Sequence, residues 1–399
     1  MSTTEPKTGV CPVKHISPIE IKPMGEWTAL YDGLREEAAV VRSDFGPGFF
    51  VFTRHEDILA AYQDWETFST EAVTVLDPNP SYLWIPHMLS GNEHLQWRRQ
   101  LGPTFAPKTV DKLENKVRQR AIEIIDSFAE RGSCDVIKDF SYRYPTTIFL
   151  ELLGLPVEDL EKFMAWEADI LHGAGNNPEE ILRRRSAAMA EVIQYFENVI
   201  VERRGNPADD LISKALEYEF DGRPVTDEEL KSYYYFMFQA GLDTVAAALG
   251  YAFYHLATHQ DDRQRVVDDT AVIPSAIEEI LRFYSFIIPS RKVTRDVEVA
   301  GCPIPAGSMV QLPLKASTRD EAAFEGAETF RIDRKPNNHL GFGAGPHRCL
   351  GSHLARFELR IALEEWHRRI PTYRLADDAT ITEFGRSSGP SAVPLVWDV

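Results

Sequence analysis

The sequence has 399 residues, of which 44% are hydrophobic, so it can bury one large core or two smaller ones. Its formal net charge of −18 opposes general attraction to nucleic acids and anionic membranes. The four cysteines, at positions 11, 134, 302 and 349, are too few and too scattered for a disulfide framework, which favours a reduced, cytoplasmic protein. No signal peptide and no apolar run long enough to span a bilayer is found, so we expect a soluble protein.

Short strands are predicted near both ends of the chain. The first part alternates between helical and strand-like patterns, with helices at 26–37 and 54–62 and strands at 39–41 and 49–52. After residue 290, short strands return between Gly and Pro turns, at 297–299, 309–312 and 392–396. These patterns predict a β-containing lobe formed by residues about 26–70, 290–330 and 372–399.

Helical patterns dominate the remainder, from about residue 90 to 285 and from 352 to 370. The predicted helices in the first of these stretches include 109–130, 146–153, 157–171, 178–204 and 209–218. No linker divides the chain. We therefore expect one domain over residues 1–399, mainly α with small β-sheets, an α+β class.

An aromatic segment from Tyr82 to Leu89 is either a buried loop or the wall of a pocket. It leads to His94 and Arg98, which lie four residues apart and so share one face of a helix. An imidazole and a guanidinium on one face suit the binding of carboxylates. Taken alone, the pair is better explained as a solvated basic face.

Thr226 and Glu229 form a capping box that begins a helix predicted to run to about His259. Inside it, Gly241, Asp243 and Thr244 interrupt an apolar and aromatic stretch. Glycine weakens a helix by about 1 kcal/mol relative to alanine, and threonine can bond to the carbonyl four residues earlier and bend the helix. A packing glycine beside a capped threonine and a functional site are equally good interpretations of these residues alone.

The stretch from Phe342 to Gly351 contains the most informative cysteine. Its glycines permit a tight turn, and a helical pattern at 352–370 places Cys349 at the start of a helix. Amide donors and the positive helix end stabilise a thiolate there, as a metal-ligating sulfur requires. The alternatives are an inert buried cysteine and a zinc site with His347 and His353, which lacks a second Cys/His pair.

Together these motifs resemble those of the cytochrome P450 family, in the family's order and over nearly the whole chain. The matching features are the haem-ligand loop (Phe342, Gly343, Gly345, His347, Cys349, Gly351), the propionate-binding residues (His94, Arg98, Arg291), the oxygen-binding groove with its acid–alcohol pair (Ala240, Gly241, Asp243, Thr244) and the structural Glu-x-x-Arg pair (Glu279, Arg282). From its i, i+3 spacing alone, the last pair is an ordinary intrahelical ion pair. Its third polar partner in the family is not identifiable in residues 327–330.

The resemblance implies the P450 fold, with haem b between the long central helix and the helix that follows the cysteine loop. Cys349 is then the axial iron ligand. His94, Arg98, Arg291, His347, Phe342, Gly343 and Gly241 are expected to contact haem or its oxygen site. Asp243 and Thr244 are expected to supply protons. These implications describe a haem-thiolate monooxygenase that uses O₂, with a peroxide-driven peroxygenase and a non-catalytic haem gas sensor as alternatives.

Within the family, the chain is most similar to soluble bacterial members of the camphor-hydroxylase type. The residues at substrate-facing positions are Tyr82, Trp84, Phe236, Ala240, Ile287, Ile288, Arg386 and Ser387. They predict a compact apolar pocket for a terpenoid-like substrate, or one whose carboxylate is held by Arg386. The chain lacks flavin and iron–sulfur motifs, so the resemblance implies that electrons come from an iron–sulfur ferredoxin with its reductase. We expect a monomer whose basic docking face for this partner consists of Arg99, Lys108, Lys112, Arg356 and Arg360.

Overall fold

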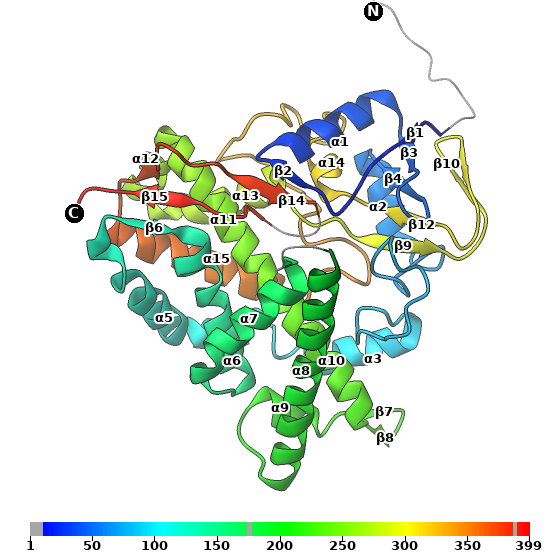
Figure 1. The fold of residues 1–399 in the computed structure, drawn as a ribbon, viewed down its shortest axis with the longest axis horizontal. Helices are drawn as coiled ribbons and strands as arrows, with labels where there is room; N and C mark the ends of the chain where they lie inside the picture. Colours follow the sequence, from blue (N-terminus) through cyan, green and yellow to red (C-terminus); the bar gives the residue numbers. More distant parts are fainter. Residues whose placement is uncertain (1–10, 174–177, 386–388) are drawn as a thin grey trace, which may run out of the picture.

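The computed structural model describes residues 11–173, 178–385 and 389–399. Figure 1 shows a mainly helical molecule, with the largest sheet on the right of the view and helices filling the lower left. The helices are α1 (Glu26–Glu37), α2 (His55–Gln63), α3 (Gly91–Leu101), α4 (Pro107–Val110), α5 (Glu114–Asp126), α6 (Arg143–Leu153), α7 (Leu160–Leu171), α8 (Pro178–Gly205), α9 (Leu211–Ala215), α10 (Asp227–Gly241), α11 (Asp243–Thr258), α12 (Gln260–Asp268), α13 (Ile273–Phe283), α14 (Leu314–Thr318) and α15 (Ser352–Arg369).

The largest sheet joins strands from both ends of the chain. Its order is β1 (Val13–Lys14), β3 (Val40–Ser43), β4 (Phe49–Phe52), β12 (Met309–Gln311), β9 (Ser290–Val293) and β5 (Phe68–Ser69). Strand β12 runs parallel to β4 and antiparallel to β9. The predicted lobe segments 26–70 and 290–330 therefore share one sheet, because their apolar strands bury both faces of β4.

The carboxyl-terminal strands pair elsewhere. β15 (Pro394–Val396) lies between β13 (Arg374–Leu375) and β6 (Ser133–Asp135), a strand of the helical body. β14 (Thr382–Phe384) pairs with β2 (Ile21–Pro23), near the start of the described chain. Two hairpins, β7 (Glu219–Phe220) with β8 (Arg223–Pro224) and β10 (Val297–Val299) with β11 (Cys302–Ile304), complete the sheets described.

The predicted long central helix is present but divides at Leu242 into α10 and α11. Its amino-terminal end has the predicted capping box, in which Thr226 and Glu229 satisfy each other's backbone N–H groups. At the division, the Thr244 hydroxyl donates to the Ala240 carbonyl at 3.0 Å, the bond expected to disturb the helix. Beyond it α11 is almost entirely buried, and its apolar residues pack with α15 in one core that includes Trp366.

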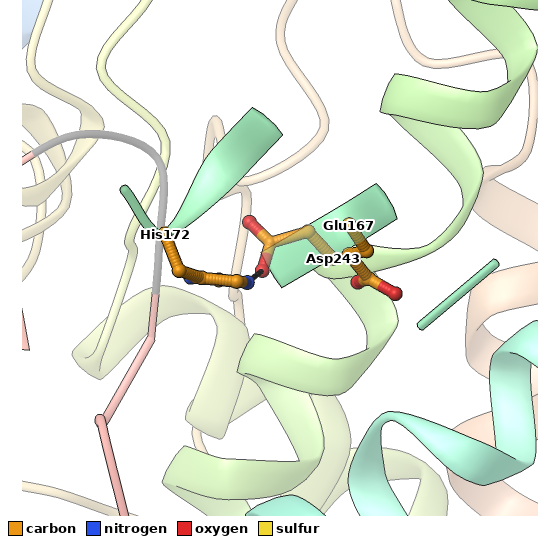
Figure 2. A group of neighbouring side chains, drawn as sticks. All are labelled: Glu167, His172 and Asp243. Carbon is orange, nitrogen blue, oxygen red and sulfur yellow. Dashed lines mark ion pairs between the residues drawn. The ribbon is translucent and has the colours of Figure 1, made fainter. Parts of the chain in front are cut away.

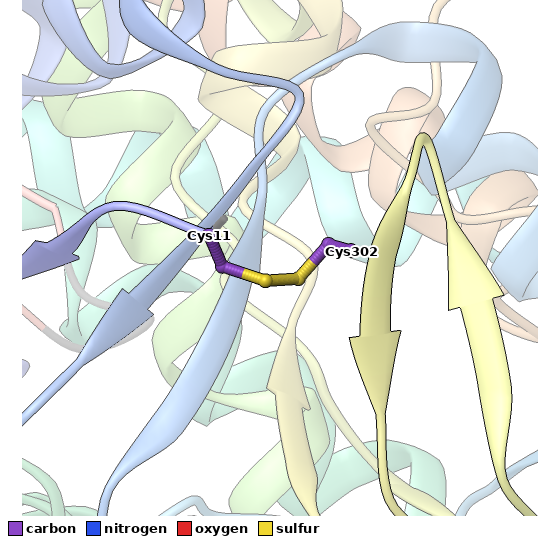
Figure 3. Close-up of a disulfide and its surroundings, with 2 residues drawn as sticks. All are labelled: Cys11 and Cys302. Carbon is purple, nitrogen blue, oxygen red and sulfur yellow. A yellow bond between two sulfur atoms is a disulfide. The ribbon is translucent and has the colours of Figure 1, made fainter. Parts of the chain in front are cut away.

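Two of the four cysteines are not reduced, contrary to the expectation from the sequence. Cys11 and Cys302 form a disulfide with Cα atoms 5.5 Å apart (Figure 3). They are separated by 291 positions in the sequence, so the proximity depends on the packing of the amino-terminal segment against the β10–β11 hairpin. Cys134 and Cys349 are free thiols. In the part of the chain that the structure describes, no helix has both the length and the apolar character needed to cross a bilayer.

Candidate active site

The loop before α15 is a tightly held turn that presents Cys349. The backbone N–H of Cys349 donates to the Phe342 carbonyl at 2.8 Å, and that of Gly343 donates to the Leu340 carbonyl at 2.7 Å. Gly343 and Gly345 have φ values of +69° and +66°, which side chains with a Cβ rarely adopt. A Cβ on Gly345 would also collide with the backbone carbonyl of Tyr62 at the end of α2. The glycines therefore fix the loop against α2.

The Cys349 thiol is accessible at its surface although protein surrounds it closely. Burial raises its pKa, while an N–H donated by Gly351 and the guanidinium groups of Arg98, Arg348 and Arg356 oppose that increase. Arg98 also donates to the Arg348 carbonyl at 2.9 Å, which joins α3 to the loop. On balance these surroundings favour the neutral thiol, so the thiolate form that a metal-ligating sulfur requires depends on the charge of a bound metal ion.

Positively chargeable side chains gather between α3, β9 and the loop. Arg291 is only 3% exposed, and its guanidinium lies over the Tyr62 ring and donates to the Ser290 carbonyl. The rings of His94 and His347 are 4.1 Å apart. Burial, with a contribution from neighbouring chargeable groups such as Arg98, lowers the pKa of His94 to about 4 and that of His347 to about 2. Among the described residues, no carboxylate pairs with Arg291.

An apolar pocket of about 250 Å³ lies beside α10 and α11. Six side chains predicted to face the substrate line it: Tyr82, Trp84, Phe236, Ala240, Ile287 and Ile288. Several lining residues were missed, because they come from segments with no shared motif, and these include Val73, Leu76, Ile170, Leu171, Arg185, Gln239, Gln311 and Gly385. The predicted contacts Arg386 and Ser387 lie outside the described residues.

Asp243 and Thr244 line the same pocket at the division between α10 and α11. Asp243 is 5% exposed, and its Oδ1 lies 3.3 Å from Nε2 of His172, which follows α7 (Figure 2). Gly241 does not line this pocket, and a Cβ there would lie 3.1 Å from Phe149 Cδ2 of α6. Gly241 therefore permits helix packing, and the pocket-lining position is Ala240.

Residues 48–366 match a family model described as Cytochrome P450. This chain belongs to the cytochrome P450 family. It is 36% identical to "Probable cytochrome P450 127A1" of Sinorhizobium fredii over 88% of this chain and 84% of that protein. It is 33% identical to "Erythromycin C-12 hydroxylase" of Saccharopolyspora erythraea over 87% of this chain and 88% of that protein. It is 30% identical to "Steroid C26-monooxygenase" of Mycolicibacterium smegmatis over 88% of each protein.

Solved P450 structures match the whole fold. CYP101J2 superposes with a TM-score of 0.88 and 29% identity over 100% of both chains. CYP101C1 gives a TM-score of 0.87 and 30% identity over 99% of this chain and 100% of that one. The predicted likeness to members of the camphor-hydroxylase type is confirmed at this level. The protein is a P450 monooxygenase with the haem-thiolate cofactor of its family, and it uses O₂.

The residues present fit a haem. Cys349 is a free thiol on the loop, and Arg291 is a buried guanidinium without a carboxylate partner among the described residues. A buried charge left in this state is costly, so the cluster around Arg291 requires an anionic partner. The two propionates of a bound haem would supply that charge, and Arg98 and His94 of α3 are the residues expected to bind them as well.

The structural pair Glu279 and Arg282 is fully buried and forms two hydrogen bonds of 2.7 and 2.8 Å. The third partner, which the sequence left unassigned, is Arg334 of this P450. Its Nε lies 3.1 Å from both carboxylate oxygens of Glu279, and Asn337 donates to Glu279 at the same distance. Arg334 lies in an irregular segment four residues beyond Phe330, where no periodic pattern indicates its direction.

Three of the five cations in the predicted docking face are exposed: Arg99, Lys108 and Lys112. The other two have carboxylate partners. Arg356 donates to Glu278 at 2.5 and 2.7 Å, and Arg360 donates to Glu364 at 2.9 Å. The positive charge available to a partner of this P450 is therefore concentrated on α3, α4 and the segment after α4.

Proposed function

We propose that this P450 hydroxylates a small-to-medium hydrophobic substrate, with a terpenoid-like compound favoured, in the cytoplasm. The pocket of about 250 Å³ with stacked Tyr82 and Trp84 carries this proposal. Its largely apolar wall suits a compact, rigid molecule that is held mainly by burial. The enzyme acts as a monomer that takes electrons from an iron–sulfur ferredoxin and its reductase.

Cys349 is the proposed axial ligand of the haem iron, and bound haem supplies the O₂ activation that the protein's side chains cannot. Arg98, Arg291, His94 and His347 bind the propionates and fix the haem's orientation. Phe342 and Gly343 hold the ligand loop in shape. Glu279 and Arg282 have a structural role behind that loop.

Asp243 and Thr244 manage protons on the substrate side. The Thr244 hydroxyl lines the pocket and donates its single hydrogen to the Ala240 carbonyl, so it donates toward the haem face only after it turns from that carbonyl. Asp243 is the acid next to it, and its side chain contacts His172 away from the pocket. This arrangement favours O₂-dependent turnover over the alternatives, because neither a peroxide-driven enzyme nor a gas sensor requires an acid–alcohol pair.

A compound screen tests the proposed function. Purified holoprotein, reduced under carbon monoxide, is expected to show the red-shifted Soret band of thiolate ligation. Terpenoids that fit the pocket are expected to shift the resting Soret band, and turnover with a ferredoxin and its reductase should yield a hydroxylated product. A normal thiolate spectrum with product from peroxide alone would favour the peroxygenase, whereas ligand binding without product in single turnover would favour the sensor.

A substrate with a carboxylate is the second candidate, favoured by a guanidinium in the pocket wall. Arg185 of α8 lines the pocket together with Gln239, and Arg386 follows the lining residue Gly385 in the sequence. A guanidinium recognises a carboxylate through paired hydrogen bonds. If either arginine holds the acid, its substitution by alanine weakens binding of carboxylate ligands and leaves neutral terpenoids unaffected. Equal binding of acids by Arg185→Ala, Arg386→Ala and the parent enzyme would dismiss this candidate.

A further inference from the structure

Two buried side chains beside Asp243 have no place in the function described so far. Glu167 of α7 is 2% exposed, and within the described chain neither of its carboxylate oxygens has a hydrogen-bond partner. His172 follows α7 and has a side chain 13% exposed. One ligand atom from each of Glu167, His172 and Asp243 lies within 4.8 Å of the others. Figure 2 shows the His172 imidazole directed at Asp243, with Glu167 beside it.

The charges around these residues do not balance unless a proton is held there. Among the described residues, His172 is the one chargeable cation within ion-pair distance of either carboxylate. The neighbouring polar groups are Tyr142 and Thr146, and the Thr146 hydroxyl donates to the Tyr142 carbonyl at 2.6 Å. Arg185 reaches the same pocket from α8. Two adjacent buried carboxylates cannot both remain ionised at low cost, so one of them keeps its proton.

We propose that Glu167, His172 and Asp243 form a relay in which Glu167 stores a proton and His172 receives protons from solvent. This inference rests on the proposed function, because the relay serves the acid–alcohol pair. Burial and the charge of Asp243 both raise the pKa of Glu167 well above its ordinary value. The neutral acid is thus the resting form of Glu167 at neutral pH.

The proton balance of the relay is simple. The Asp243 carboxylate takes the proton of the Glu167 carboxyl and passes a proton on toward Thr244, which leaves Asp243 an anion again. Glu167 is then an anion and regains a proton through the His172 imidazole, whose two ring nitrogens are buried, so water reaches them when this side chain moves. No bond other than these O–H and N–H bonds changes, and no oxidant is consumed. Glu167 and His172 act through Asp243 and are positioning residues for its proton.

Infrared spectroscopy of the resting, substrate-free holoenzyme tests the stored proton directly. A carbonyl band of a protonated carboxyl is expected at neutral pH, and Glu167→Gln should remove it. Glu358→Gln is the matched control, since Glu358 is 4% exposed in α15 and burial raises its pKa as well. That control should remove a different band. If Glu167→Gln leaves every protonated-carboxyl band in place, the proposal is wrong.

Turnover provides the second measurement. In Glu167→Gln and His172→Gln, the fraction of electrons recovered in product should fall about tenfold and the solvent isotope effect on product formation should increase, since proton transfer becomes slower. Glu167→Asp should restore part of the coupling, and Glu358→Gln should leave it unchanged. Haem content and the carbon monoxide spectrum should match the parent enzyme in all four variants. Parental coupling in Glu167→Gln would contradict the relay.

Metal analysis shows whether a proton or a metal ion neutralises the carboxylates of this cluster. Holoenzyme dialysed against Zn²⁺ is expected to bind no zinc that depends on these residues. One equivalent of zinc retained by the parent and lost in Glu167→Gln would assign the cluster to a metal and overturn the relay. Failure of the proposed function has a different signature, in which the parent enzyme itself lacks the thiolate spectrum or forms no product.

Discussion

The roles of single side chains in this P450 follow from the hydrogen bonds that they can donate. Thr244 shows this most clearly, because its hydroxyl is both a helix-bending group and the nearest pocket donor to Asp243. Removing that hydroxyl leaves the apolar pocket nearly intact but takes away the donor. The loss of the hydroxyl should therefore change the fraction of electrons recovered in product and not the affinity for substrate.

Thr244→Ala is expected to consume reduced nicotinamide through its redox partners at close to the parental rate while less product and more hydrogen peroxide are formed. We expect the product fraction to fall by about tenfold or more, within the range for loss of a proton-transfer group. Thr258→Ala is a suitable control, since that hydroxyl also donates to the carbonyl four residues earlier in α11 but is remote from the pocket lining. A parental product-to-peroxide ratio in Thr244→Ala would refute the assigned role.

The raised pKa of Glu167 also predicts how the stability of the protein changes with pH. Its pKa is raised from 4.5 in the folded protein, so the folded state retains a proton that the unfolded state releases as pH rises. The free energy of unfolding therefore decreases with pH at this residue, by up to about 1.4 kcal/mol per pH unit. Relative to the parent, Glu167→Gln should gain stability between about pH 5 and pH 8, as measured by urea unfolding.

Exposed Glu161 on the same helix supplies a control for that measurement. Glu161→Gln is expected to change the unfolding free energy by less than about 0.5 kcal/mol, as is usual for a surface substitution. A stability difference between Glu167→Gln and the parent that does not grow with pH would show that Glu167 is ionised in the folded state.

At the scale of elements, the sequence was informative where the signal is local. The first helix and the strand at residues 49–52 have the predicted ends, because the apolar pattern that indicates them lies within the element itself. The motifs also located the ligand loop and six residues of the pocket. Arg334, Glu167 and His172 were missed, because their partners are set by how separate elements pack and nothing in the local pattern marks them.

Arg334 shows what such a partner contributes. It is 5% exposed, contacts both oxygens of Glu279 and donates to the carbonyls of Glu325, Gly326 and Thr329. Removing it leaves a buried carboxylate with one cation fewer and frees the segment before the ligand loop. Breaking a buried pair typically costs about 3–5 kcal/mol.

We expect Arg334→Ala to lower the stability by an amount in that range and to reduce haem incorporation, measured as haem absorbance per protein. Arg331→Ala is the matched control, since its exposed side chain donates only to the Glu325 carbonyl within the described chain, while its backbone N–H bonds to Glu279. That control should retain haem. Full haem content and parental stability in Arg334→Ala would show that Arg282, Asn337 and the Arg331 backbone N–H satisfy Glu279 without Arg334.

At the scale of the whole molecule, the disulfide joins the amino-terminal segment to the β10–β11 hairpin. Closing a loop of this length restricts the unfolded chain, an effect estimated at about 4 kcal/mol or more for loops of 100 residues and above. Thiol titration of the denatured, unreduced protein should detect two thiols, Cys134 and Cys349, and after reduction four. Cys302→Ser should lower the unfolding temperature and leave the thiolate spectrum unchanged. Four thiols without reductant would show that the bond does not form.

The pairing of β14 with β2 affects the timing of assembly during synthesis. Strand β2 lies near the beginning of the described chain, whereas β14 and the pocket residue Gly385 come from its last twenty residues. A nascent chain therefore holds an unpaired β2 and an open substrate chamber until β14 and Gly385 have been synthesised. Cys349 precedes them by only about 35 residues, so haem capture and closure of the chamber are expected to occur close together in time.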